Sequence, residues 1–459
     1  MSAMTHATAA PATTPSVTLH ALTRACPVSY AQESLWSPSG QSAINVPAVV
    51  RFRGRLDRPR LFQALDTLAE RHDALRTVLW RSPEGVLEQH VAPAGSLPVD
   101  TVEHPDTLEH GLPALLLAGS ERPFRLDGEP LVRAELHGFG PEDQLLIVWM
   151  HHAVTDLAAT RVVVEEIKQL YTGVQPEPVR SQQCDYAVYE RALRADAEQE
   201  RYWKDALGSA DDRIGLPVPD GTDHLAVRPA LPLLPAEIVE PLGRLAASHR
   251  TTLTAVLATA VLATHADEAD GGRMVLGLTM SNRDHPRFRS TVGCLTDQLP
   301  LVVDTAGSDL TFSQLLDRVR AAMLDAYDHR LPLGVLLPLL GRRRPPVFAI
   351  NLNFLPLGPN LPAPAETWDV EVGDVEFPYG IVKRRPDPWW LGDAVLAYRP
   401  RLDGRGLGGE IEGDAGIHGL AAVTHYGARF GALLAGAAWN PELPVHTLTD
   451  RSGRADRLG

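Results

Sequence analysis

Cysteine is scarce in this chain of 459 residues, where only Cys26, Cys184 and Cys294 occur. The three are too few and too scattered for a disulfide framework or a Cys-x-x-Cys metal site, and we interpret all of them as small apolar residues. Such usage is typical of a reducing compartment. We therefore expect a cytoplasmic protein.

Basic charge and long apolar segments are lacking as well. The formal net charge of -14 argues against a general nucleic-acid or anionic-membrane binder, because neither polyanion is attracted to an acidic surface. The longest apolar helical candidate, residues 253–263, is much shorter than the roughly 20 residues that cross a bilayer, so we predict a core helix there. Residues 1–17 lack the basic start and apolar core of a signal peptide, and we predict a disordered leader.

The rest of the composition is that of a soluble globular protein, with 44% hydrophobic and 22% charged residues. The length exceeds one ordinary core, so two lobes are expected. Strand-like and helix-like segments alternate, and a Pro-rich break near residues 215–235 precedes a second series of them. The expected strands are 48–52, 75–80, 144–150 and 274–279, and the expected helices are 60–71, 157–170 and 235–249. This pattern predicts an α/β protein.

Two imidazoles and a carboxylate occur within six residues at His151, His152 and Asp156. They lie between the expected strand 144–150 and the expected helix 157–170, at a turn of the kind that commonly carries function. Neighbouring side chains of an extended segment point to opposite faces, so only one histidine can face a given cleft. We therefore expect the two histidines to have different roles, and for the same reason we assign no metal to them.

A structural explanation of the same residues stays open. Asp156 directly precedes the expected helix, where its carboxylate is placed to cap that helix or to pair with an arginine. A buried pair of histidines beside a capping aspartate is more often structural than catalytic. The three residues alone do not decide between the two interpretations.

Several further segments, in order along nearly the whole chain, resemble the condensation domains of nonribosomal peptide synthetases. Residues 29–36, SYAQESLW, are similar to the S-x-A-Q-x-R-L-W motif of that family, and residues 71–77, RHDALRT, are similar to R-H-E-x-L-R-T. His151 to Asp156 match H-H-x-x-x-D. Residues 185–189, DYAVY, the following YW at 202–203, and VGCLTD at 292–297 resemble D-Y-A-x-W, Y-W and V-G-x-F-V-N.

The chain departs from the family pattern at four positions. Leu157 replaces the glycine that follows the aspartate, which adds bulk beside the expected channel. Ser34 replaces an arginine of the first motif. Asp297 and Gln298 replace the asparagine and threonine of the last motif, so polar contacts at those places are not carried over from the family.

The resemblance implies two chloramphenicol-acetyltransferase-like lobes that form a V-shaped pseudo-dimer around a central channel. We expect an N-terminal lobe at residues 18–180, a crossover region at 181–235 and a C-terminal lobe at 236–459. A monomer is expected, because the two lobes already form the interface that related trimers build between subunits. The chain leaves no room for an adenylation or carrier domain, so a free-standing enzyme is expected.

The implied activity is acyl transfer, with amide or ester formation between a carrier-bound acyl or aminoacyl thioester and an amine or alcohol acceptor, supplied free or on a second carrier protein. The thioester arm is the 4'-phosphopantetheine of a carrier protein bound in trans, and no cofactor is expected on this chain. Two alternatives stay open, namely a coenzyme A-dependent acyltransferase of the same superfamily and a non-catalytic recruitment module.

The site residues follow from the matched motifs. His152 is expected as general base or positioning group, with His151 in support. Asp156 is expected in a structural salt bridge with Arg283, and Arg71 and Arg76 as supporting residues that are scaffold more often than substrate contacts. The N-H groups at the start of the helix after Asp156, beginning with Leu157, are predicted donors to the oxyanion.

Overall fold

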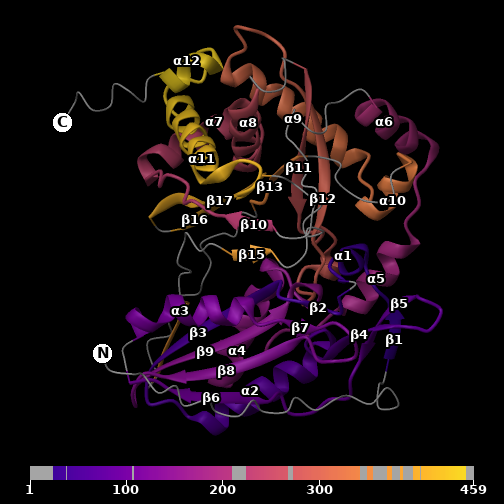
Figure 1. Ribbon diagram of the computed structural model, residues 1–459, viewed down its shortest axis with the longest axis vertical. Helices are drawn as coiled ribbons and strands as arrows, with labels where there is room; N and C mark the ends of the chain where they lie inside the picture. The colour runs from indigo at the N-terminus through magenta and orange to yellow at the C-terminus, as the bar shows by residue number, and fades with distance from the viewer. Residues whose placement is uncertain are drawn as a thin grey trace.

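The computed structural model forms two lobes stacked one above the other, with the N-terminal part of the chain in the lower lobe of Figure 1. The structure describes residues 24–37, 39–105, 108–208, 224–266, 272–341, 349–354, 370–374, 383–385, 396–403 and 405–450. The predicted leader at residues 1–17 lies outside these ranges. Among the described residues, the helices are all too short or too polar to cross a membrane.

A five-stranded sheet forms the centre of the lower lobe, in the order β14-β3-β9-β8-β6. Its strands are β3 (Asn45–Gly54), β6 (Val99–Glu103), β8 (Val132–Gly138), β9 (Asp143–His151) and β14 (Val370–Asp374). Strand β9 is central because its apolar run is buried on both faces, and it pairs antiparallel with both β3 and β8. The strand ends at His151, so the sheet fixes the start of the histidine turn.

Helices and two small sheets complete the lower lobe. The helices are α1 (Tyr30–Ser34), α2 (Arg58–Arg71), α3 (Leu108–Glu121), α4 (Leu157–Thr172) and α5 (Gln183–Ala192), with the 3-10 turns η2 (Asp73–Arg76) and η3 (His152–Val154). The next helix, α6 (Ala197–Gly208), lies in the upper lobe, where Trp203 and Leu207 join the core (Figure 1). The small sheets have the orders β1-β5-β4 and β2-β7. Their strands are β1 (Arg24–Pro27), β2 (Gln41–Ser42), β4 (Thr77–Arg81), β5 (Leu87–Val91) and β7 (Phe124–Arg125). Helix α4 packs against β3 and α2, and thereby holds the segment after Asp156 on the sheet.

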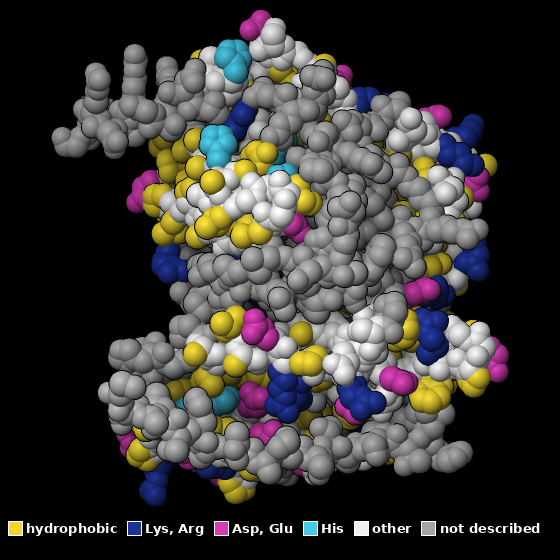
Figure 2. Space-filling view, viewed as in Figure 1, with side chains coloured by type: hydrophobic (Ala, Val, Ile, Leu, Met, Phe, Trp, Pro, Cys, Tyr) yellow, Lys and Arg dark blue, Asp and Glu magenta, His cyan; other side chains and the backbone are white. Residues whose placement is uncertain are grey.

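The upper lobe is built on a seven-stranded sheet in the order β12-β11-β13-β16-β17-β10-β15. Its strands are β10 (His224–Val227), β11 (Arg273–Met280), β12 (Asp297–Asp304), β13 (Ile350–Leu352), β15 (Lys383–Arg385), β16 (Leu396–Asp403) and β17 (Gly406–Asp414). The helices are α7 (Ala236–Ser248), α8 (Leu253–His265), α9 (Phe312–Asp328), α10 (Leu333–Leu339), α11 (Gly419–Ala437) and α12 (Val445–Asp450), with the 3-10 turn η4 (Pro286–Phe288). Helix α8 is buried from Ala255 onward and packs against α7, α9 and α11, so it is the core helix that its apolar sequence predicts. In Figure 2, hydrophobic side chains gather on the surface around α11.

One late segment crosses from the upper lobe to the lower. Strand β14 (Val370–Asp374) pairs antiparallel with β3 at the edge of the lower sheet, although the strands before and after it belong to the upper sheet. Strand β10 (His224–Val227), from the expected crossover region, joins the upper sheet. Pairing between distant segments of this kind leaves no periodic signal in the sequence.

The elements predicted from periodicity are present. The expected strands at 48–52, 144–150 and 274–279 lie within β3, β9 and β11, and the expected helices at 60–71, 157–170 and 235–249 correspond to α2, α4 and α7. The expected strand at 75–80 begins two residues later as β4, because residues 73–76 form the turn η2. The two-lobed α/β fold is confirmed.

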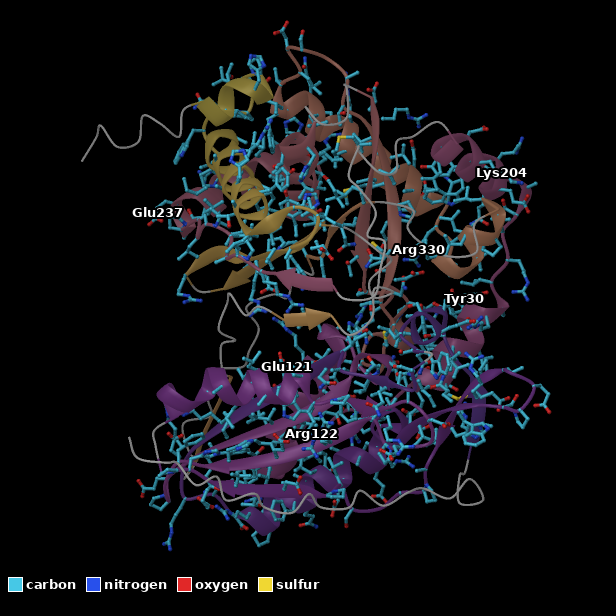
Figure 3. The ribbon with its side chains drawn as sticks, viewed as in Figure 1. Tyr30, Glu121, Arg122, Lys204, Glu237 and Arg330 are labelled. Carbon is cyan, nitrogen blue, oxygen red and sulfur yellow. A yellow bond between two sulfur atoms is a disulfide. The ribbon has the colours of Figure 1, made fainter. Side chains whose placement is uncertain are left out.

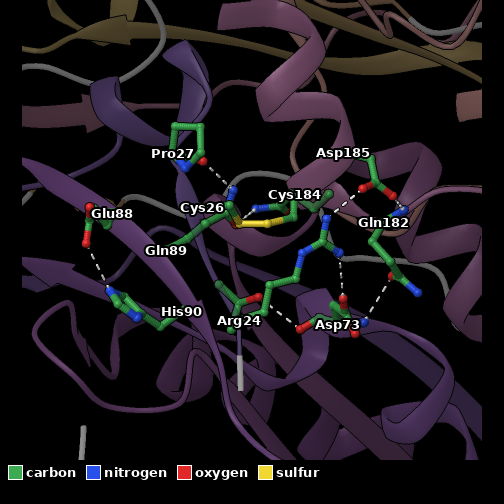
Figure 4. The surroundings of a disulfide bond; sticks show 12 residues. Arg24, Cys26, Pro27, Asp73, Glu88, Gln89, His90, Gln182, Cys184 and Asp185 are labelled. Carbon is green, nitrogen blue, oxygen red and sulfur yellow. Dashed lines mark hydrogen bonds and ion pairs between the residues drawn. A yellow bond between two sulfur atoms is a disulfide. The ribbon is translucent and has the colours of Figure 1, made fainter. Parts of the chain in front are cut away.

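The expectation that all three cysteines are unpaired is wrong for two of them. Cys26 of β1 and Cys184 of α5 form a disulfide whose Cα atoms are 6.0 Å apart, across a sequence separation of 158 residues (Figure 4). The fold brings β1 against α5, which no local spacing reveals. The argument for a reducing compartment therefore loses its support from these residues, whereas Cys294 is a free, buried thiol.

Candidate active site

The adjacent histidines have different surroundings. His151, the last residue of β9, is fully buried, and its Nδ1 accepts a hydrogen bond of 3.2 Å from the Ala153 N-H. His152 begins the turn η3 and is partly exposed. Its backbone N-H donates to the Ile44 carbonyl at 2.9 Å, which ties the turn to the segment before β3. Of the two histidines, only His152 is not fully buried.

Burial lowers the pKa of both imidazoles. The pKa of His151 falls to about 3, because burial is reinforced by the neighbouring His152 and by Arg133. The pKa of His152 is also lowered by burial, although hydrogen bonds to the backbone carbonyls of His152 and Thr155 and the charge of Asp156 oppose that shift. Both rings are therefore neutral near pH 7, which is the state of a general base.

Two groups from the later part of the chain act on His152. The Cys294 Sγ lies 3.6 Å from His152 Nδ1, and burial raises the pKa of this thiol well above its usual range, so it stays protonated. Arg399 of β16 contributes to the lowered pKa of His152 through its charge. Arg399 is itself bound to the Glu410 and Glu412 carboxylates. His152 therefore lies where the two lobes meet.

Asp156 connects the histidine turn to the upper lobe. Its Oδ2 accepts from Arg283 Nη1 at 2.7 Å and from the Leu295 N-H at 2.9 Å, while its Oδ1 accepts from the Ala159 N-H at 2.8 Å. The expected ion pair with Arg283 is thus present, and the same carboxylate caps α4. Asp156 therefore has both roles that its sequence position allowed, as helix cap and as partner of an arginine.

The segment that carries Arg283 is shaped around this contact. The guanidinium also donates to the carbonyls of Thr291 and Gly293, at 3.0 and 3.3 Å. Gly293 has a φ of +152°, and a Cβ there would lie 2.4 Å from Gln183 Oε1, so a side chain does not fit. Gln183 in turn accepts from the Cys294 N-H and donates to the Ala153 carbonyl, which joins α5 to both sides of the site.

Arg71 and Arg76 are not brought to His152 by their hydrogen bonds. Arg71 donates to the Glu166 carboxylate at 2.8 Å, and Arg76 donates to Asp73 at 2.9 Å and to the Ala69 carbonyl at 2.8 Å. These contacts tie α2 and η2 to α4 and to the surrounding scaffold. They favour the scaffold role over substrate contact.

Leu157 begins α4 directly beside Asp156, and its side chain is 44% exposed. The Ala159 N-H of the same first turn is already used by the Asp156 cap, so the proposed oxyanion donors reduce to the N-H groups before it. In the part of the chain that the structure describes, no group of three or more potential ligands is placed to hold a metal ion. Sequence reasoning missed the approach of Cys294 to His152, because the two residues are 142 positions apart and no motif links them.

Comparison with known proteins places this geometry in a family. The two-lobed fold is that of the chloramphenicol-acetyltransferase-like condensation domains, as its similarity to solved structures shows. The X-domain from teicoplanin biosynthesis has a TM-score of 0.75 at 21% identity, covering 92% of this chain and 96% of that one. SgcC5 from Streptomyces globisporus has a TM-score of 0.74 at 20% identity, covering 91% of this chain and 100% of that one.

The family model described as Condensation domain matches residues 23–376, and the chain therefore belongs to the condensation-domain family. Tyrocidine synthase 3 of Brevibacillus parabrevis is 32% identical over 66% of this chain and 5% of its own length. The dimodular nonribosomal peptide synthase of Bacillus subtilis (strain 168) is 32% identical over 72% of this chain and 15% of its own length. The chain thus spans only a small part of these curated relatives, which are enzymes of natural-product assembly.

Proposed function

We propose that this chain joins an acyl or aminoacyl group, delivered as a thioester on the 4'-phosphopantetheine arm of a carrier protein, to an amine or alcohol acceptor. The observation that carries the proposal is the partly exposed, neutral His152 on a turn that the buried Asp156–Arg283 pair fixes between the lobes. A rigid turn that presents one neutral imidazole suits proton transfer at neutral pH.

The acceptor nitrogen or oxygen attacks the thioester carbonyl carbon, and His152 Nε2 removes the proton from that nucleophile. The tetrahedral intermediate collapses with cleavage of the carbon-sulfur bond, and the proton returns from His152 to the departing thiolate. The lowered pKa keeps the imidazole unprotonated at the start, and it makes the imidazolium formed in the first step a stronger acid for the departing thiolate. The oxyanion is held by the N-H groups at the start of α4, of which Leu157 provides the first.

The chain's own residues divide these tasks. His152 transfers the proton. His151 stabilises the turn by accepting a hydrogen bond from the Ala153 N-H. The Asp156–Arg283 ion pair holds the turn in place and takes no part in bond making or breaking. The phosphopantetheine is supplied by the carrier protein and is a substrate group of the reaction.

The test is intact-protein mass spectrometry of acyl-loaded carrier proteins mixed with this protein and a panel of amines and alcohols. We expect loss of the acyl mass from the carrier, dependent on an acceptor and abolished in His152→Ala. The matched control is His249→Ala, which removes an imidazole paired with Asp317 outside the site. Turnover of the same acyl group on coenzyme A but on no carrier would instead indicate a coenzyme A-dependent acyltransferase, and inactivity with both donors would indicate a non-catalytic module.

A further inference from the structure

A cavity of about 150 Å³ lies between α5, the end of β11 and the start of β12. Its lining includes Asp297, Gln298, Tyr186, Tyr189, Phe288 and Arg330. A space of this size holds a ligand group of roughly six non-hydrogen atoms. Figure 3 labels Arg330 in the upper lobe and Tyr30 in the lower, and the cavity lies at this boundary between the lobes.

The cavity wall is linked to His152 through Cys294. Asp297 follows Cys294 by three residues, so at most about 10 Å of extended backbone separates them. The Cys294 Sγ itself lies 3.6 Å from His152 Nδ1. Asn282, which also lines the cavity, donates to the Leu295 carbonyl at 2.8 Å, and the Leu295 N-H binds Asp156. The wall of the cavity and the support of the catalytic turn are therefore the same segment.

Asp297, which is half-buried, brings a carboxyl to this wall. Its Oδ1 accepts from the Gln298 N-H at 2.8 Å and its Oδ2 accepts from the Leu333 N-H at 2.9 Å. A carboxylate has about four acceptor positions, so these two bonds leave capacity for a further donor. Burial raises the pKa of Asp297 to about 6, which leaves the group mostly ionised at pH 7 but poorly compensated.

The buried carboxyl of Glu190 adds to the negative charge. Glu190 accepts from the Tyr30 N-H at 2.7 Å and from the Tyr186 hydroxyl at 3.0 Å. Its pKa is raised to about 7 by burial and then by the charge of Asp297. Among the residues that the structure describes, neither carboxyl forms an ion pair with a side chain. The cation at the cavity, Arg330, is paired with Asp284 at 2.7 Å, and its charge lowers the pKa of Asp297 against the larger effect of burial.

Aromatic rings form the other side of the cavity. The Phe288 ring lies 5.3 Å from the ring of Tyr186 and 5.3 Å from that of Tyr189, measured between centroids. The Tyr186 hydroxyl is bound to Glu190 and Asn282, which fixes the ring. Aromatic faces next to a desolvated carboxylate attract an organic ammonium, because the ring quadrupole and the charge act in the same direction.

We propose that this cavity binds the protonated amino group of a diamine or basic amino-acid acceptor, with the Asp297 carboxylate as counter-ion and the rings of Tyr186 and Tyr189 as its walls. This proposal rests on the proposed function in that the second nitrogen of the same acceptor is the nucleophile beside His152. Selectivity for a charged amine over a neutral one depends on the charge of Asp297. The motif that this segment resembles has a neutral asparagine at the same position.

The test compares diaminopentane with pentylamine, which have the same chain length and differ in the terminal ammonium. In direct competition for one acyl-loaded carrier, we expect the diamine product to exceed the monoamine product by about tenfold or more, because a buried charge-assisted hydrogen bond is gained. In Asp297→Asn the ratio should fall toward one. This substitution keeps a carbonyl oxygen to accept the Leu333 N-H, so the start of α10 keeps its contact. The matched control, Asp317→Asn, removes an exposed carboxylate outside the cavity and should keep the wild-type ratio.

Calorimetric titration of each amine into the protein without carrier separates this proposal from the proposed function. Binding of diaminopentane that is tighter than that of pentylamine, and that is weakened about tenfold in Asp297→Asn but not in Asp317→Asn, supports the cavity even if no carrier is turned over. Equal binding of the two amines, or equal weakening by both substitutions, overturns the cavity proposal even if acyl transfer is observed.

Discussion

Arg283 Nη1 lies 2.7 Å from Asp156 Oδ2, and this ion pair joins the upper lobe to the turn that carries His152. The Asp156 side chain is 0% exposed, and the Arg283 side chain is 7% exposed. A buried charge is stable only beside its partner, because water cannot reach it to replace the ion pair. The pair therefore fixes the position of the histidine turn against the second lobe.

Removal of either partner should destabilise the fold before it informs on chemistry. Asp156→Ala or Arg283→Ala leaves one buried charge uncompensated, and each should lower the free energy of unfolding by about 3 to 5 kcal/mol. Urea denaturation measures this change. The control is Arg318→Ala, which breaks an exposed pair with Asp304 and should cost no more than about 1 kcal/mol. An Asp156→Ala protein that is as stable as Arg318→Ala would show that the pair is not structural.

Acid should destabilise the protein through His151 and His152. Both have a pKa lowered in the folded state, so below about pH 6.5 the unfolded chain binds more protons than the folded one. Stability is therefore full above that pH and falls as the pH drops, by about 1.4 kcal/mol per pH unit for each histidine until its folded pKa is reached. For His151 that point is about pH 3.

Urea denaturation at pH 7 and pH 5 tests this dependence in the wild type and in His151→Gln, which cannot titrate in this range. The variant should lose about 1.4 kcal/mol less per pH unit than the wild type. Imidazole NMR signals provide a second measurement that does not depend on the stability of the variant. A His151 ring that is protonated at pH 5 in the folded protein would contradict the assignment.

Local sequence predicted the parts of this site that depend on local structure. The apolar run before His151 predicted strand β9, and the periodicity after Asp156 predicted helix α4. The change of pattern between them predicted the turn that carries His152. The partner of Asp156 lies 127 residues away, and only the resemblance to a family pattern indicated Arg283. Elements follow from periodicity because periodicity reflects one buried face, whereas contacts between lobes have no such local cause.

Three features of the structure depend on contacts between distant segments and could not be predicted from local sequence. Strand β14 completes the lower sheet from a late segment, and Cys294 contacts His152 from a segment 142 residues later in the chain. The third is the cavity at Asp297: the residue itself is a visible departure from the motif, but the cavity depends on α5 and on the turn before α10. Each depends on tertiary packing that composition and spacing do not encode.

The exposed Leu157 should restrict the space beside His152. Since the proposed reaction takes place at the start of α4, Leu157→Gly should raise kcat/KM for bulky acyl donors by about tenfold relative to small ones, as the loss of a few methylene-sized contacts allows. Competition between a long and a short acyl-loaded carrier measures the ratio. Leu420→Gly removes another exposed leucine from the first turn of a helix, α11, and should leave the ratio unchanged. The same ratio in Leu157→Gly as in the wild type would place the donor elsewhere.

The disulfide between Cys26 and Cys184 should be detectable by counting thiols. Under denaturing conditions without reductant, alkylation should modify Cys294 alone, and after reduction it should modify all three cysteines. Mass spectrometry distinguishes the two states. Three modified cysteines without reduction would show that the pair is not oxidised in the purified protein.

Loss of this bond should weaken both the fold and the site. Cys26→Ser should lower the free energy of unfolding by about 2 to 5 kcal/mol, because the bond closes a long loop. Cys184 directly follows Gln183, which binds both the Ala153 carbonyl and the Cys294 N-H, so release of α5 from β1 should also reduce acyl transfer. Reductant should lower the stability of the wild type to that of Cys26→Ser and leave the variant itself unchanged. A variant that reductant destabilises further would place the effect at another group.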